Sequence, residues 1–83
     1  MILVELYSKE DCRLCEVVKE LLLKVQHTQP FEFRQISIHE GDEFFENFKE
    51  KIPLIYINRE LAFQYRVSER EFRKKLSSAE QPG

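Results

Sequence analysis

Cys12 and Cys15 are the only cysteines in the chain, and their spacing is typical of redox chemistry. They form a Cys-Arg-Leu-Cys sequence, directly after the apolar run 2–7 and at the start of an amphipathic segment. This order predicts that both thiols lie between a strand and a helix N-terminus. The helix dipole and unpaired N–H groups there favour negative charge, which stabilises a thiolate. A C-x-x-C pair in this setting indicates a site that cycles between dithiol and disulfide.

Two other interpretations of the cysteines are open at this point. Free cysteine is often a small core residue, and Cys15 fits that role in part because it lies at the edge of an apolar stripe. Cys12 does not, since it precedes the helix and is expected to be exposed. A zinc site needs about four ligands, and His27 and His39 lack the short spacing of a zinc-finger pair. We therefore predict no metal ligands and favour the redox interpretation.

Length and composition limit the class of protein. A chain of 83 residues makes one small domain, and it must bury much of its apolar surface to be stable. With 42% hydrophobic and 34% charged residues, the chain is expected to be globular. A formal net charge of -2 argues against nucleic acid as a partner.

The expected compartment follows from what the sequence lacks. Residues 1–5 do not resemble a secretory signal, and no stretch is long enough to span a membrane. We therefore expect a cytoplasmic protein that makes no membrane contact. In a reducing compartment a cysteine pair is more often catalytic or metal-binding than structural.

The elements that must position the two thiols alternate along the chain. Hydrophobic periodicity predicts strands and helices in the order β-α-β-α-β-β-α. The last helix has a capping box at Ser68 and Glu71, with Val67 and Phe72 placed as a hydrophobic staple. The strands are expected at 2–7, 31–38, 54–57 and 60–65, and the first two helices at 13–26 and about 42–50. The domain is predicted to span 1–76, with a flexible tail at 77–83.

With these elements in place, the chain resembles a glutaredoxin. The likeness rests on Tyr7-Ser8-Lys9-Glu10-Asp11-Cys12-Arg13-Leu14-Cys15 and on Ile52-Pro53 before a strand hairpin. It is nearest to small glutaredoxin-like proteins that carry C-x-L-C in place of C-P-Y-C. The resemblance implies an α/β thioredoxin-like fold, with a four-stranded mixed sheet and helices on both faces.

The resemblance also implies roles for residues around the thiols. Members of the fold hold the proline that matches Pro53 in the cis form, facing the thiol pair. The residue before it, here Ile52, offers its backbone to an extended substrate segment. Glutaredoxins use a lysine at the position of Lys9 to hold a glutathione carboxylate and to favour the thiolate. Arg13 takes the place of the usual proline and is a second candidate for substrate binding.

One departure from the glutaredoxin pattern concerns glutathione. Glutaredoxins place a Gly-Gly pair and an acidic residue after the last hairpin strand, where they cradle the γ-glutamyl end of glutathione. This chain has Phe63-Gln64-Tyr65-Arg66 there. Glycine lets a backbone approach a ligand closely, so the bulky side chains predict weak or no glutathione binding.

The sequence therefore predicts a monomeric thiol-disulfide oxidoreductase. Cys12 would attack a protein or small-molecule disulfide, and Cys15 would resolve the mixed disulfide. No cofactor is expected, and thioredoxin reductase and glutathione are candidate electron donors. The alternatives are a thioredoxin-fold binding module with vestigial thiols and, less favoured, an iron–sulfur or metal carrier.

Overall fold

The computed structural model of the chain describes residues 1–43, 45–48 and 50–80. It confirms the predicted element order and the mixed four-stranded sheet, whose strand order is β2-β1-β3-β4. Strand β1 pairs parallel with β2 and antiparallel with β3, and β3 pairs antiparallel with β4. The elements are β1 (Leu3–Lys9), α1 (Arg13–Gln26), β2 (Glu32–Ile38), α2 (Phe45–Phe48), β3 (Leu54–Ile57), β4 (Glu60–Gln64) and α3 (Glu69–Glu80).

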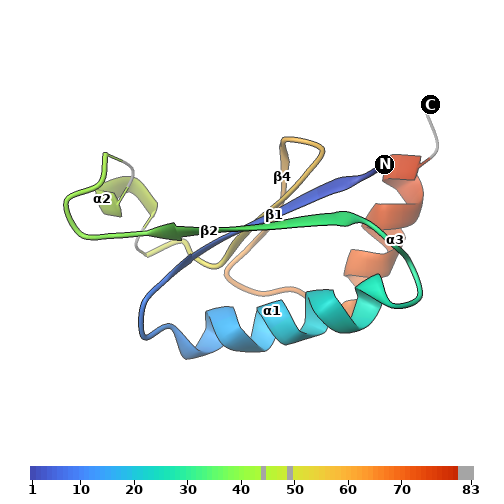
Figure 1. Cartoon of the computed structure of the whole chain (residues 1–83), viewed down its shortest axis with the longest axis horizontal. Coiled ribbons are helices and arrows are strands. Elements are labelled where there is room, and N and C mark those ends of the chain that lie inside the picture. Colours follow the sequence, from blue (N-terminus) through green and yellow to red (C-terminus); the bar gives the residue numbers. More distant parts are fainter. Residues whose placement is uncertain (44, 49, 81–83) are drawn as a thin grey trace.

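Alternating side chains of β1 separate the two faces of the sheet. Val4 and Leu6 point into the main core and are fully buried, as the two-residue period of a strand requires. Helices α1 and α3 cover this face, and Figure 1 shows both on the same side of the sheet. Each helix contributes an apolar stripe to the main core. The α1 stripe is Val18, Leu22 and Val25, and the α3 stripe is Phe72 and Leu76.

The second face of the sheet is covered mainly near one end. Tyr7 points to this side, where its ring lies 5.9 Å from that of Phe48 in α2 and 5.4 Å from that of Tyr56 in β3. Helices therefore lie on both faces, but α2 is short. It was expected at about 42–50 and is described over 45–48, while residues 44 and 49 lie outside the described part.

The hairpin between β3 and β4 turns without glycine. Asn58 and Arg59 both adopt positive φ, at 51° and 69°, which is the backbone of a type I′ turn. The Asn58 N–H donates to the Leu3 carbonyl at 2.8 Å, and the Leu3 N–H donates to Asn58 Oδ1 at 3.0 Å. These two bonds hold the turn against the start of β1, and asparagine tolerates the left-handed region better than most residues.

Helix α3 begins where the capping box predicted it but ends later than expected. The Glu71 N–H donates to Ser68 Oγ at 3.2 Å. Residues 77–80, expected in the tail, are helical, and residues 81–83 lie outside the described part. The helix continues because Ala79 packs against the core and Ser77 Oγ accepts a 3.4 Å bond from Gln29.

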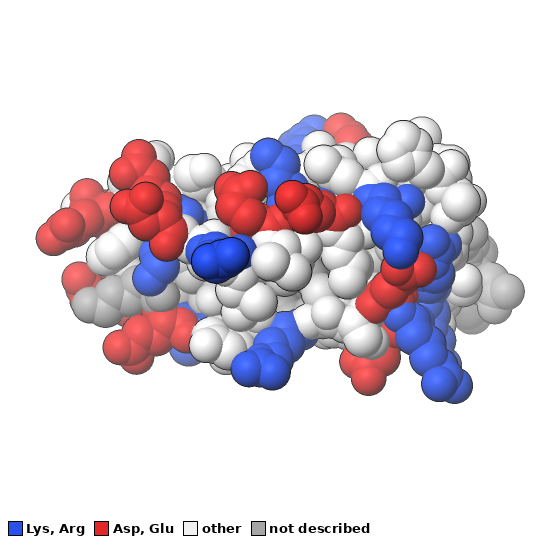
Figure 2. All heavy atoms as spheres, turned by 90° about the horizontal axis from the view of Figure 1, so that it is seen from below, with Lys and Arg blue, Asp and Glu red and all other residues white. Residues whose placement is uncertain are grey.

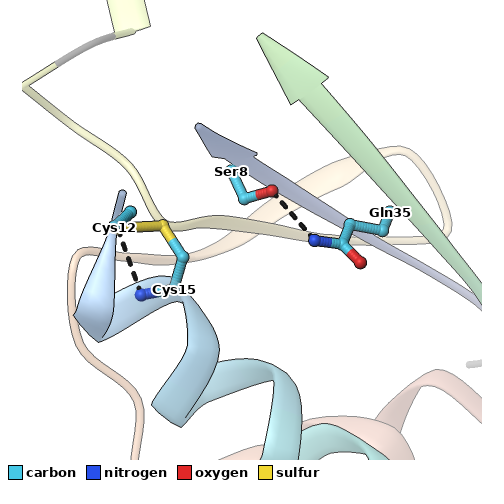
Figure 3. The surroundings of a disulfide bond; sticks show 4 residues. All are labelled: Ser8, Cys12, Cys15 and Gln35. Carbon is cyan, nitrogen blue, oxygen red and sulfur yellow. Dashed lines mark hydrogen bonds between the residues drawn. A yellow bond between two sulfur atoms is a disulfide. The ribbon is translucent and has the colours of Figure 1, made fainter. Parts of the chain in front are cut away.

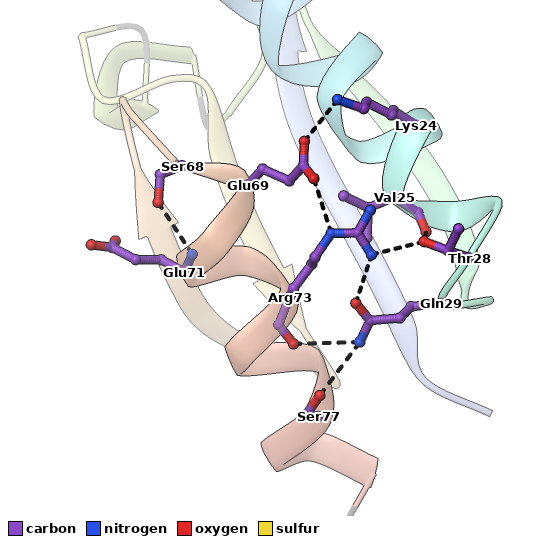
Figure 4. Close-up of polar contacts among 9 residues, drawn as sticks. All are labelled: Lys24, Val25, Thr28, Gln29, Ser68, Glu69, Glu71, Arg73 and Ser77. Atoms are coloured by element: carbon purple, nitrogen blue, oxygen red, sulfur yellow. Dashed lines mark hydrogen bonds and ion pairs between the residues drawn. The ribbon is translucent and has the colours of Figure 1, made fainter.

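A polar network joins α3 to the end of α1 (Figure 4). Arg73 Nη1 donates to Thr28 Oγ1 at 2.7 Å and to Gln29 Oε1 at 2.9 Å. Glu69 accepts from Arg73 Nε at 3.0 Å and from Lys24 Nζ at 3.0 Å. The network fixes the two helices that cover one face of the sheet.

Within the described residues, no helix is long and apolar enough to cross a membrane.

Candidate active site

Cys12 and Cys15 form a disulfide at the start of α1 (Figure 3). Their Cα atoms are 5.2 Å apart. Cys12 is the N-cap of the helix, with an extended backbone, and its Sγ accepts a 3.1 Å hydrogen bond from the Cys15 N–H. In the dithiol form the same N–H can stabilise a Cys12 thiolate, because a charged acceptor strengthens such a bond.

The two sulfur-bearing residues differ in exposure. Cys15 is only 3% exposed and packs with Ile38, Ile52 and Leu54. Cys12 is half-buried and lines a surface hollow of about 410 Å³ together with Asp11, Arg13 and Glu16. A substrate can therefore approach Cys12 from the surface, whereas Cys15 lies behind it.

The turn before the disulfide has an unusual backbone. Asp11 adopts φ 55°, in the left-handed region, directly before Cys12. For residues other than glycine this conformation costs roughly 1–2 kcal/mol, and aspartate is among the residues that tolerate it best. The turn reverses the chain between β1 and α1. Asp11 was not among the site residues predicted from the sequence, although aspartate directly before a helix cap was the available signal.

The Ile52–Pro53 peptide bond is cis, as the resemblance predicted. Pro53 is buried, and its carbonyl accepts a 2.7 Å bond from the Tyr65 N–H. Ile52 lies in the same apolar cluster as Cys15, so the structure brings these two predicted site residues together. The Ile52 N–H, however, donates to the Phe48 carbonyl at 3.1 Å. This bond engages the Ile52 N–H within the chain.

The two predicted cations lie in neighbouring places. Arg13 lines the hollow around Cys12. Lys9 lines an adjoining hollow of about 340 Å³ with Glu10, Asp11 and Glu40 among its walls. Asp11 borders both hollows. The structure thus places Arg13 beside the disulfide and Lys9 one hollow further away.

A buried hydroxyl lies behind the site. Ser8 is 3% exposed and is the one buried polar residue in the described part of the chain. Its Oγ accepts a 3.1 Å bond from Gln35 Nε2, and Figure 3 shows the pair near the disulfide. Ser8 was not among the site residues predicted from the sequence. The available signal was a polar residue in the buried phase of β1, after Val4 and Leu6.

Tyr7 is the ionisable group near this end whose pKa departs clearly from its ordinary value. Partial burial raises the pKa of its phenol, and the negative charge of Glu5 and the neighbouring Tyr56 add to the rise, while Arg59 opposes it. Tyr7 is therefore neutral at physiological pH and contributes packing.

Among the described residues, no group of three or more histidine, cysteine, aspartate or glutamate side chains is arranged to hold a metal ion.

Comparisons with known proteins agree with this geometry. The family model described as Glutaredoxin-like domain (DUF836) matches residues 3–77. A structural-genomics target protein from X. campestris has a similar structure, with TM-score 0.75 and 17% identity over 90% of this chain and 96% of that one. A Nitrosomonas europaea protein solved by NMR gives TM-score 0.74 and 18% identity, covering 89% of each chain. A malarial protein has a TM-score of 0.62 and 13% sequence identity, and the match covers 95% of this chain and 97% of that one.

Proposed function

Because this chain belongs to the glutaredoxin-like domain family (DUF836), whose model spans residues 3–77, we propose that it is a thiol-disulfide oxidoreductase. The observation that carries the proposal is the Cys12–Cys15 disulfide at the N-terminus of α1, with one cysteine accessible and the other buried. That asymmetry supports Cys12 as the nucleophile and Cys15 as the resolving thiol.

The reaction exchanges one disulfide for another. The Cys12 thiolate attacks one sulfur of a substrate disulfide, a Cys12–substrate bond forms, and the first substrate thiolate leaves and takes up a proton. Cys15 then loses its proton and attacks the Cys12 sulfur. The second substrate thiol is released, and the Cys12–Cys15 disulfide forms. Two electrons and two protons pass to the substrate, and an external thiol donor must return them.

The proposal includes the setting of the reaction. We place the protein in the cytoplasm as a monomer, without an organic cofactor or metal. Its substrate is a protein or small-molecule disulfide, and its donor is a thioredoxin reductase or glutathione. Lys9, Arg13, Ile52 and Pro53 are proposed to contact the substrate, with Ile52 doing so through its carbonyl.

Weak glutathione binding forms part of the proposal. Tyr65 adopts φ 71°, a conformation that glycine takes without cost, and the residue is 48% exposed. The Arg66 guanidinium lies 5.9 Å from the centre of its ring. Phe63 instead turns inward, with its ring 6.3 Å from that of Phe72. Tyr65 and Arg66 are therefore the side chains that would fill the space a glycine pair leaves open.

The test uses two matched single variants. The reduced protein should reduce a neutral synthetic peptide disulfide, Cys15→Ser should accumulate a mixed disulfide detectable by mass spectrometry, and Cys12→Ser should do neither. Loss of reductase activity in both variants, with trapping only in Cys15→Ser, supports the assigned roles. If the reduced wild-type protein reduces no disulfide yet captures a protein stably, the chain is a binding module instead.

A further inference from the structure

The surface around the disulfide is rich in carboxylates. Asp11 and Glu16 line the hollow that contains Cys12. Asp11 also lines the adjoining hollow, where Glu10 and Glu40 join it. Arg13 shares the hollow around Cys12 with two carboxylates, those of Asp11 and Glu16. A substrate that reaches Cys12 through this hollow passes Asp11 and Glu16.

The acidity is concentrated in two segments of the sequence. Residues 9–16 and 40–51 carry eight carboxylates (10, 11, 16, 40, 42, 43, 46 and 50) against four cations (9, 13, 49 and 51). Their net charge is therefore −4, while the rest of the chain amounts to +2, which together give the formal total of -2. Figure 2 shows acidic side chains gathered toward the end that carries α2, and basic side chains along α3.

The backbone next to the disulfide also offers an acceptor. The Ile52 N–H already donates to the Phe48 carbonyl. The proposed function therefore gives the substrate contact of Ile52 to its carbonyl. A peptide N–H is the natural donor to that carbonyl. Carboxylates and a carbonyl together fit a ligand that brings hydrogen-bond donors and positive charge.

We propose that the substrate is a disulfide within a basic stretch of polypeptide, a specificity that rests on the proposed oxidoreductase function. Lysine or arginine side chains flanking the substrate cysteine pair with Asp11, Glu16 and Glu40. The substrate backbone donates to the Ile52 carbonyl. Glutathione disulfide carries net negative charge, so the same surface repels it. Complementary charge of this kind acts chiefly on the association rate, by about tenfold to a thousandfold at low salt.

The experiment compares two peptide disulfides that differ only in their flanking residues, one lysine-flanked and one glutamate-flanked. The fully reduced protein is mixed with each, and the second-order rate is divided by the rate of the same peptide with dithiothreitol, which corrects for intrinsic reactivity. The corrected rate for the lysine peptide should exceed that for the glutamate peptide by about tenfold or more at low ionic strength. High salt should shrink the ratio, because it screens exposed charges.

A pair of variants separates local from global charge. Asp11→Asn/Glu16→Gln removes two carboxylates beside Cys12, and asparagine tolerates the left-handed backbone of residue 11. Glu60→Gln/Glu71→Gln removes two at exposed positions outside both hollows. The first variant should lose several-fold of the lysine preference, and the second should keep it.

The outcomes distinguish the two proposals. Equal corrected rates for both peptides, or equal loss of preference in both variants, would overturn the basic-substrate inference while leaving the oxidoreductase intact. Reduction of neither peptide would overturn the oxidoreductase itself. A preference for the glutamate peptide would show that Lys9 and Arg13 dominate the surface and would also contradict the inference.

Discussion

Two residues of the same type differ here because their surroundings differ. Cys12 has an N–H donor aimed at its sulfur and an open hollow in front of it, whereas Cys15 is enclosed by Ile52, Leu54 and Ile38. Position at the helix N-terminus favours the anion of Cys12, and burial disfavours the anion of Cys15. The carboxylates near Cys12 act in the opposite direction, since like charge raises the pKa of a thiol.

We expect the pKa of the Cys12 thiol in the reduced protein to be below the ordinary value of about 8.5, and below that of Cys15. Alkylation of the reduced protein should therefore modify Cys12 first, with a rate that rises as pH increases through that pKa. Thiolate absorbance in Cys15→Ser measures the pKa directly. A Cys12 that titrates like a free thiol, or that resists alkylation, would contradict its role as the nucleophile.

The left-handed backbone of Asp11 gives a second test at this scale. Asp11→Ala should destabilise the protein by roughly 1 kcal/mol, because alanine pays the full steric cost of positive φ. Asp11→Gly and Asp11→Asn should cost less, since both residues accept this region. Urea denaturation of the three oxidised variants measures the difference. If Asp11→Ala and Asp11→Gly destabilise the protein equally, the left-handed conformation does not explain the aspartate at this position.

At the scale of the elements, α3 is held to α1 by charges as well as by its apolar stripe. Arg73 contacts two side chains of the segment that ends α1, those of Thr28 and Gln29, and Glu69 bridges Arg73 and Lys24. The two cations lower the pKa of Glu69 through hydrogen bonds, first from Lys24 and then from Arg73. Its carboxyl is solvent-exposed, so the effect on stability is modest and sensitive to salt.

The lowered pKa of Glu69 fixes the direction of a pH effect. The unfolded chain binds the proton more tightly than the folded one, so the contribution is present above about 4.5 and is lost as pH falls through the folded pKa. Glu69→Gln should therefore be less stable than wild type at pH 7, and the gap should close under acid conditions. Glu20→Gln, which removes an exposed glutamate of α1, is the control and should show no such closing gap.

At the scale of the whole molecule, hydrophobic periodicity in the sequence predicted more of the structure than the chemistry of individual side chains did. The stripes of α1 and the capping box of α3 determine where those helices lie, because apolar burial and local hydrogen bonds act within a few residues. The extra turn of α3 depends on Ala79 reaching the core, and the glycine-free hairpin turn depends on Asn58 bonding Leu3. Such contacts join distant parts of the chain, so no local pattern reveals them.

The candidate site was likewise predicted only in part from the sequence. The cysteine pair and the cis Ile52–Pro53 bond were predicted, the second only through resemblance. The positive φ of Asp11 and the bond from the Ile52 N–H to Phe48 were not predicted. Both arise from how the loops at one end of the sheet pack together. Sequence spacing identified the cysteine pair, and the three-dimensional structure identified the groups that surround it.

The burial of Cys15 beside Cys12 has a consequence for how well the protein resists irreversible oxidation by hydrogen peroxide. Oxidation of Cys12 by hydrogen peroxide yields a sulfenic acid, which condenses with an adjacent thiol to a disulfide and water. Because Cys15 is enclosed yet within bonding reach, this condensation should outrun further oxidation to irreversible acids. Reduced wild-type protein exposed to peroxide should lose two hydrogens and recover them with dithiothreitol, whereas Cys15→Ser should gain oxygen that dithiothreitol cannot remove. Equal accumulation of irreversible oxygen in both proteins would show that the enclosed thiol gives no such protection.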